Sequence, residues 1–210
     1  MSSNIYFFIA IIPSIVLHEV SHGWVALHYG DPTAKEQHRL TLNPLAHIDP
    51  FGTILLPALL LFSGLPAIGY AKPVPVNFSR LRNPRRQSLY VSMAGPAMNL
   101  VLVVFSYLLC EFAVHVLKTG SLAQGVFNAG MYLGLVNLFL AAFNLIPIPP
   151  LDGSAIIERF IPSRRLPSYY RFRQYALPLV FALIILDSVF FHLRATVFTD
   201  LENWWFNRII

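Results

Sequence analysis

The sequence predicts an all-α polytopic membrane protein with about four transmembrane helices plus one re-entrant or fifth hydrophobic segment. Hydrophobic residues make up 56% of the 210 residues and charged residues only 12%, whereas an average soluble domain carries about 25% charged residues. The mean hydropathy is +0.59, and five apolar runs approach the roughly 20 residues that a helix needs to cross a bilayer. We expect one membrane-embedded domain over residues 1–210, with its core at 5–160 and a C-terminal helix and interfacial tail at 170–210.

The apolar runs are separated by turn-rich segments, and they cover residues 5–29, 51–70, 89–117, 125–146 and 175–191. The first basic residue of the chain is Lys35. Because a secretory signal peptide begins with a basic region, we expect the first run to be retained as a helix.

The distribution of Lys and Arg predicts how the runs cross the membrane. Segments 71–88 and 147–174 each contain five basic residues, segment 30–50 contains two, and segment 118–124 contains only Lys118. Basic loops tend to remain in the cytoplasm, which places the first three segments inside and segment 118–124 outside.

Run 51–70 would then have both flanks on the cytoplasmic side, which a single span cannot satisfy. It contains Pro57, Gly64 and Pro66, and proline interrupts the hydrogen bonds of a helix. We therefore predict a broken, re-entrant element. A full span with segment 30–50 outside would misplace only two cations, and this alternative stays open.

Two surface elements are also predicted. Segment 35–50 alternates weakly between polar and apolar residues, which indicates a short strand or hairpin at the membrane surface. The tail after residue 192 carries Trp204, Trp205 and Arg208, a composition typical of a helix anchored at the headgroup level.

The motif His18-Glu19-Val20-Ser21-His22 is the sharpest chemical signal in the sequence. Residues four apart lie on one face of a helix, so both imidazoles can bind one zinc ion while the glutamate acts as general base toward water. The pattern also occurs by chance, with histidines that only satisfy loop carbonyls. Inside an apolar helix, however, ionisable groups cost a few kcal/mol each, which favours a functional role.

Catalytic zinc sites use three protein ligands, and Asp152 is the candidate for the third. It follows a proline-rich segment at the end of an apolar run. Prolines forbid a continuous helix there, and irregular backbone at membrane depth must line a protein-packed or polar cavity. The alternative is that Asp152 only caps a following helix.

Taken together, these residues resemble the site-2 protease family of intramembrane zinc metalloproteases. The similarity rests on the motif at 18–22, on Asn144–Gly153, and on Gly95-Pro96-Ala97-Met98-Asn99, which matches a Gly-Pro-x-x-Asn stretch of the family. Segments 43–52 and 69–77 are similar to a compact bacterial subgroup. The resemblance implies one zinc per chain, with His18, His22 and Asp152 as ligands and Glu19 as base. It also implies transmembrane protein substrates, cut near the cytoplasmic leaflet.

Two asparagines are candidate donors to the oxyanion of the transition state. For Asn144, eight residues before Asp152, this role is slightly favoured over a hydrogen bond to a backbone carbonyl. For Asn99 the structural role is favoured, with Gly95 allowing close helix packing. His47 and Asp49 reach the site only if segment 35–50 folds back, and Asp49 is more simply a turn residue.

Four further ionisable residues lie in or beside apolar runs. Glu111, His115 and His192 lie near the ends of their runs and are expected to reach the membrane interface. For Asp187, the sequence suggests only an interaction with a polar group on another helix of the bundle.

Other functions compete with proteolysis. A membrane metal-ion transporter would use Glu111, His115 and Asp187 as steps of a path, but it would have acidic or His-rich entry loops, and these loops are basic. An inactive relative that only binds membrane partners would not need Glu19. The basic residues lack the pattern of a nucleic-acid site, so no nucleic-acid partner is expected. We expect a multi-pass protein of the bacterial inner membrane whose site faces the cytoplasm; the oligomeric state is not indicated.

Overall fold

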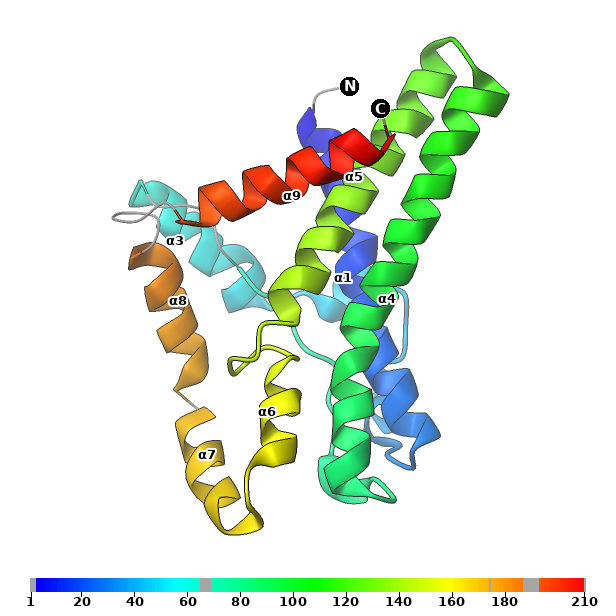
Figure 1. The fold of residues 1–210 in the computed structure, drawn as a ribbon. Coiled ribbons are helices and arrows are strands. Elements are labelled where there is room, and N and C mark those ends of the chain that lie inside the picture. The colour runs from blue at the N-terminus through cyan, green and yellow to red at the C-terminus, as the bar shows by residue number, and fades with distance from the viewer. Residues whose placement is uncertain (1–2, 65–68, 174, 187–192, 210) are drawn as a thin grey trace.

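Three long helices form the centre of the protein in the computed structural model (Figure 1). They are α1 (Ser3–His28), α4 (Pro84–Phe112) and α5 (Ser121–Asn144). The structure describes residues 3–64, 69–173, 175–186 and 193–209. Within these ranges, three helical stretches are long and apolar enough to cross a membrane: Ile5–His28, Pro84–Leu117 and Ser121–Asn144. The predicted all-α polytopic membrane fold is therefore confirmed.

The ends of these helices follow from local sequence. Asn83 caps α4 by accepting a hydrogen bond from the Arg86 amide, and Pro84 occupies the first turn, where its missing N–H costs nothing. Beyond α4, the π-helical turn η4 (Ala113–Leu117) leads to Gly120, whose φ of 106° reverses the chain into α5.

The described helical part of the second apolar run is too short to cross a bilayer. It forms the π-helical η2 (Pro50–Leu55) and α3 (Leu56–Phe62), six and seven residues long. At 1.5 Å per residue this is about 20 Å, against a hydrocarbon core of about 30 Å. The structure thus favours the broken element over a full span; Pro66 lies outside the described residues.

The strand considered for segment 35–50 is wrong, because no part of this segment forms one. It contains α2 (Thr33–Glu36) and the 3₁₀ helix η1 (Pro44–His47). The Asn43 side chain accepts from the Leu45 amide at 3.1 Å, and this local turn replaces strand pairing.

The fifth run is described only in part, and it is not among the three spans counted above. Its described part is α8 (Ala176–Leu186), 11 residues long. Asp187 and His192, which the sequence left without a clear role, lie outside the described residues.

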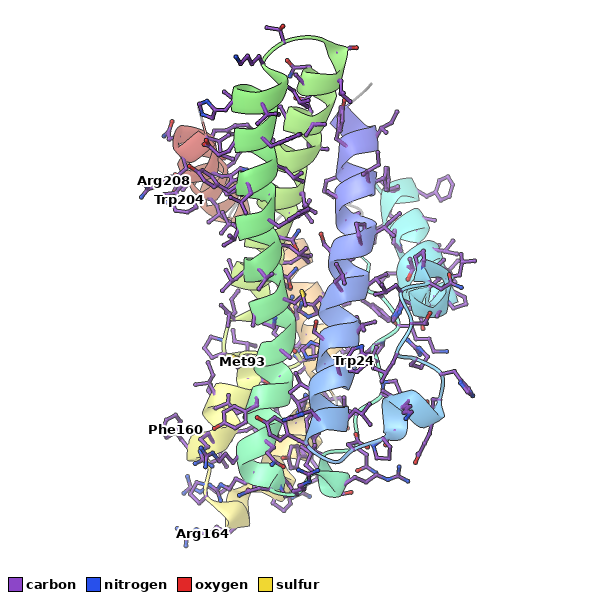
Figure 2. All side chains as sticks on the ribbon, turned by 90° about the vertical axis from the view of Figure 1, so that its right-hand side faces the viewer. Trp24, Met93, Phe160, Arg164, Trp204 and Arg208 are labelled. Carbon is purple, nitrogen blue, oxygen red and sulfur yellow. The ribbon has the colours of Figure 1, made fainter. Side chains whose placement is uncertain are left out.

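The remaining short helices gather at the end of the bundle where α4 begins. They are η3 (Phe78–Arg80), α6 (Ser154–Phe160), η5 (Ser163–Arg165) and α7 (Leu166–Arg173). Arg164 lies at this end in Figure 2, opposite the turn between α4 and α5. The Arg85 guanidinium donates to the Ile161 carbonyl at 2.9 Å, so two of the basic segments meet here.

The bundle has an apolar outer surface, and a few polar side chains are buried within its largely hydrophobic interior. Large exposed hydrophobic side chains cover α1, α3 and α4, whereas the side chains of Ser14, Asn99, Ser106 and Asn137 are completely buried. Small and polar residues between helices are typical of membrane bundles, where lipid replaces water around the outer surface. The arrangement is that of a multi-pass membrane protein.

Helix α9 (Leu193–Ile209) crosses the bundle and packs on α5 (Figure 1). Trp205 is only 2% exposed, and its indole N–H donates to the Met131 carbonyl at 3.1 Å. Trp204 is exposed instead, with the Arg208 guanidinium 5.8 Å from its ring centre (Figure 2). A membrane-surface role for the tail stays a prediction, but one of its two tryptophans is part of the protein core.

Gly134 provides the space for Trp205. A Cβ at this position would overlap the Trp205 ring and lie 2.6 Å from the Ser106 hydroxyl. We expect Gly134→Ala to lower stability in detergent by about 1–3 kcal/mol and to expose Trp205, which a red shift of tryptophan fluorescence would report. Gly125→Ala is the control, because a Cβ there meets only the Tyr6 hydroxyl at 3.9 Å. Equal melting temperatures for the two variants would contradict this packing.

Candidate metal centre

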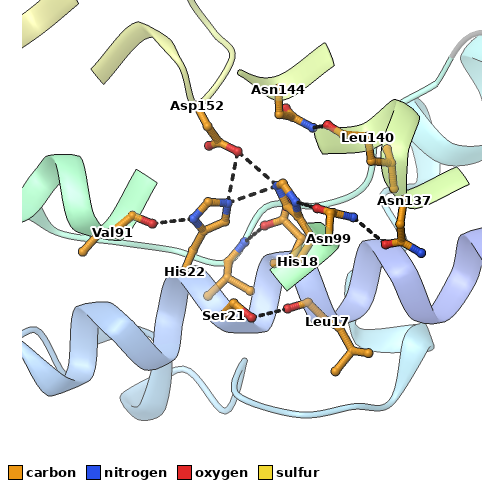
Figure 3. Close-up of polar contacts among 12 residues, drawn as sticks. Leu17, His18, Ser21, His22, Val91, Asn99, Asn137, Leu140, Asn144 and Asp152 are labelled. Atoms are coloured by element: carbon orange, nitrogen blue, oxygen red, sulfur yellow. Dashed lines mark hydrogen bonds and ion pairs between the residues drawn. The ribbon is translucent and has the colours of Figure 1, made fainter. Parts of the chain in front are cut away.

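The two histidines of the motif lie on one face of α1, one turn apart. The helix is continuous through His18 and His22, so their side chains point the same way. Their rings stand nearly perpendicular, at 82°, with centroids 4.8 Å apart. The His18 side chain is buried, and Figure 3 shows it beside Asn99 of α4.

Asp152 reaches these rings because the chain breaks after α5. The helix ends at Asn144, and the Gly153 amide donates back to the Asn144 carbonyl at 2.7 Å, which closes the proline-rich loop. A Cβ on Gly153 would lie 2.5 Å from the carbonyl carbon of Leu145, so the tight return requires glycine. The loop thereby places Asp152 above α1 (Figure 3).

Three ligand atoms converge. The Asp152 Oδ2 atom is 3.1 Å from His18 Nε2 and 3.4 Å from His22 Nε2, and the two Nε2 atoms are 3.1 Å apart. Ligands bound at 2.0–2.1 Å in a tetrahedron are separated by about 3.3–3.4 Å. The three atoms therefore have the spacing of three corners of a zinc coordination tetrahedron. In the described parts of the chain, no other group of three or more His, Cys, Asp or Glu residues brings its ligand atoms as close together.

The hydrogen bonds on the far side of each ring show which nitrogen carries the proton. His22 Nδ1 lies 2.7 Å from the Val91 carbonyl, and His18 Nδ1 lies 2.5 Å from Asn99 Oδ1. Both partners are acceptors, so each Nδ1 donates and each neutral ring presents an Nε2 lone pair toward Asp152. In this tautomer, three electron-pair donors face one another without a proton between them. A cation bound among them would accept all three lone pairs.

Asp152 itself supports this reading. Its Oδ2 atom is buried and has no hydrogen-bond partner among the described residues.

Gly95 on α4 leaves the space beside the imidazoles open. A Cβ at this position would lie 2.5 Å from both Cε1 and Nε2 of His18 and would also overlap His22 Nε2. The predicted close helix packing at Gly95 is therefore present. Because Gly95 has no side chain, α4 passes close to the His18 and His22 rings without covering their Nε2 atoms.

Glu19 lines the same cavity as the three candidates. The cavity has a volume of about 490 Å³ and includes Asn144 and part of segment 69–76 in its lining. The Val74 amide donates to Glu19 Oε2 at 2.8 Å, which holds the carboxylate in place. Pro73 and Pro75 flank this amide and have no N–H to offer.

Asn144 also lines the cavity, although one of its amide hydrogens is already used. Its Nδ2 donates to the Leu140 carbonyl at 3.0 Å, within the last turn of α5. A side-chain amide has two N–H groups, so the second remains for another acceptor.

The other candidates do not line this cavity. Asp49 accepts from the Phe51 and Gly52 amides as a turn residue, and His47 Nε2 lies 3.0 Å from the Thr41 carbonyl. Glu111 and His115 pair with each other at 3.1 Å near the opposite end of α4. Among the residues that the structure describes, Glu111 and His115 are therefore not linked to the centre by the path that a transporter would need; Asp187 lies outside these residues.

Three partners of the centre were not predicted from the sequence. Asn99 and the Val91 carbonyl contact the histidines, and the Val74 amide contacts Glu19. The Gly-Pro-x-x-Asn block pointed to Asn99 as a residue of interest, but nothing in the sequence indicated its contact with His18. Backbone partners such as Val91 leave no signal in residue type.

Comparisons with known proteins agree with this geometry. The model of "Peptidase family M50" matches residues 6–119 and 112–186. The chain is 42% identical over 160 residues to "Putative zinc metalloprotease YwhC" of Bacillus subtilis, covering 75% of this chain and 69% of that protein. It is 31% identical over 195 residues to "Putative zinc metalloprotease Rip2" of Mycolicibacterium smegmatis, covering 92% and 70%.

A more distant relative is "Zinc metalloprotease MJ0392" of Methanocaldococcus jannaschii, 26% identical over 167 residues, which cover 78% of this chain and 38% of that protein. No solved structure matched the chain. The family match spans most of the chain, and the names of its relatives agree on a zinc enzyme. The chain therefore belongs to peptidase family M50, the site-2 protease family, and is a zinc metalloprotease.

Proposed function

We propose that this zinc metalloprotease hydrolyses peptide bonds within or next to transmembrane segments of membrane proteins. In this proposal His18, His22 and Asp152 hold the zinc ion and Glu19 is the general base. The observation that carries it is the convergence of three candidate ligand atoms inside a bundle whose outer surface is apolar. A substrate that reaches such a site comes from the membrane.

Each residue has a role that its surroundings support. Zinc, when bound, lowers the pKa of a coordinated water molecule to about 7. Glu19 lies one residue after His18 and lines the same cavity, so its carboxylate can accept the proton of the attacking water and return it to the leaving amine. The Val74 amide fixes one carboxylate oxygen and leaves the other free for this transfer.

Asn144 is proposed as the donor to the oxyanion that develops on the substrate carbonyl. Its free N–H is in the cavity wall, and the hydrogen bond to Leu140 holds the amide on the last turn of α5. Donors of this kind contribute about 2.7–4 kcal/mol where they have been removed. The substrate must unwind locally, because the carbonyls of an intact helix are already hydrogen-bonded.

The charge distribution supports a site on the cytoplasmic side of a bacterial inner membrane. The basic segments around Arg85 and Arg159 meet at the end of the bundle where α4 begins. The histidines lie in the same half, since they contact Val91 and Asn99 in the first sixteen residues of α4. Basic ends of membrane bundles face the cytoplasm.

Glu19→Gln is expected to retain about one zinc per chain and to lose cleavage by roughly 10²–10⁴-fold, because the amide cannot accept a proton. Zinc content measures the first effect. Mass spectrometry of membrane proteomes from cells with the wild-type or variant protein measures the second, as transmembrane fragments that only the wild type produces. Equal fragments from both would remove Glu19 as the base.

Asp152→Ala is expected to weaken zinc binding by at least about 100-fold, more than changes in residues that only support a ligand, and to abolish cleavage. Competition with a chromophoric chelator in detergent measures the affinity. Glu158→Ala, in the helix that follows, is the control, since Glu158 pairs with Arg173 at 2.8 Å rather than with a histidine. Unchanged zinc affinity in Asp152→Ala would contradict the assigned ligand set.

Gly95→Ala is expected to reduce zinc binding without unfolding the bundle, because its methyl group would occupy the space beside His18 and His22. Zinc content and melting temperature in detergent are the two measurements, and Gly125→Ala is the matched helix variant. A fully zinc-loaded Gly95→Ala protein would show that this space is not needed for the metal.

A further inference from the structure

A chain of buried polar side chains leads from the interior of the bundle to His18. Ser14, Asn137 and Asn99 belong to α1, α5 and α4, and each is completely buried. The Asn137 amide lies 2.7 Å from the Ser14 hydroxyl, the Asn99 amide lies 2.8 Å from Asn137 Oδ1, and Asn99 Oδ1 lies 2.5 Å from His18 Nδ1. Asn137 and Asn99 are shown beside the histidines in Figure 3. Buried polar groups of this kind are costly unless all are paired.

The backbone determines which way Asn137 points. Its Nδ2 also donates to the Leu133 carbonyl at 2.8 Å, and a carbonyl can only accept. The Ser14 hydroxyl donates to the Ala10 carbonyl at 2.7 Å, so toward Asn137 it can only accept. Both contacts require the NH₂ group of Asn137 on their side, which leaves Oδ1 facing Asn99.

The orientation of Asn99 then follows. Because Asn137 Oδ1 only accepts, Asn99 presents its NH₂ group to it and its Oδ1 to His18. His18 Nδ1 must donate to that oxygen, so the proton of the neutral ring is on Nδ1 and the Nε2 lone pair faces Asp152. A reversed Asn99 would place N–H groups against Nδ1 and favour the proton on Nε2, where it blocks a metal.

We propose that Asn99 and Asn137 are positioning residues that hold His18 in its metal-binding tautomer, with Ser14 as the outer end of the chain. The proposal rests on the proposed function, since it takes His18 to be a zinc ligand. His22 needs no such chain, because the Val91 carbonyl accepts from its Nδ1 directly. The centre therefore depends on three helices being packed in register, not only on the motif of α1.

The experiment measures Zn²⁺ affinity of the metal-free protein in detergent, by competition with a chelator. Asn99→Ala is expected to bind zinc about 10–100-fold more weakly, the usual effect of removing such a partner. Asn99→Asp keeps an acceptor for His18 Nδ1, although its second oxygen opposes Asn137 Oδ1, and it is expected to bind zinc more tightly than Asn99→Ala. Ser106→Ala, which removes another completely buried serine from the same helix as Asn99, is expected to leave the affinity unchanged.

Asn137→Leu separates orientation from packing. In the wild-type background it is expected to weaken zinc binding about 10–100-fold, because Asn99 is free to reverse. In the Asn99→Asp background it is expected not to weaken zinc binding, since a carboxylate presents an acceptor in either orientation and Asn137→Leu removes the oxygen that opposes it. A purely structural role for Asn137 would give the same loss in both backgrounds.

Equal losses in both backgrounds, or wild-type affinity in Asn99→Ala, would overturn the proposal. If Asn137→Leu does not fold, the comparison of Asn99→Ala with Asn99→Asp decides the question alone. His18→Ala distinguishes the two levels of the account, because unchanged zinc affinity in that variant would overturn the proposed function, not only the role of the asparagines.

Discussion

The structure depends on three electron-pair donors that face one another with no proton to share. The Nε2 atoms of His18 and His22 and the Oδ2 atom of Asp152 lie within 3.1–3.4 Å of one another. Such an arrangement is unfavourable in a buried space unless a cation neutralises it. Its geometry explains why the chain breaks after α5, and why α4 carries a glycine where it passes the two rings.

The bundle around this centre combines an apolar outer surface with a few buried polar side chains. Its outer surface is apolar, and its interior contains serine and asparagine side chains that bond across helices. Without a hydrophobic driving force between helices, close packing and such hydrogen bonds set the register of the bundle. The same contacts that align α1, α4 and α5 also reach His18, so helix packing and metal chemistry are linked in this protein.

The sequence predicted the features that depend on the local spacing of residues and on the free-energy cost of placing ionisable side chains in an apolar helix. Histidines four apart in an apolar helix, and an aspartate after a proline-rich break, were sufficient to propose Asp152 as a partner 130 residues from His22. The all-α membrane fold, the zinc cofactor and the family were predicted correctly. The roles of individual site residues stay predictions that the distances support.

What the sequence did not predict depends on tertiary placement. The alternation over His38, Leu40 and Leu42 is too short to indicate a strand against the turn that Asn43 and Pro44 form. The contact of Asn99 with His18, and that of Asn137 with Asn99, join three helices whose register no periodicity specifies. Trp205 likewise reads as a membrane-surface residue until Gly134 is seen to accommodate it.

Anomalous diffraction at the zinc absorption edge, from crystals of the zinc-loaded protein, tests the central claim most directly. We predict one strong peak per chain, about 2.0–2.2 Å from the Nε2 atoms of both histidines and from an Asp152 carboxylate oxygen. A zinc peak bound elsewhere in the chain, or one bound to the histidines with Asp152 turned away, would contradict the account.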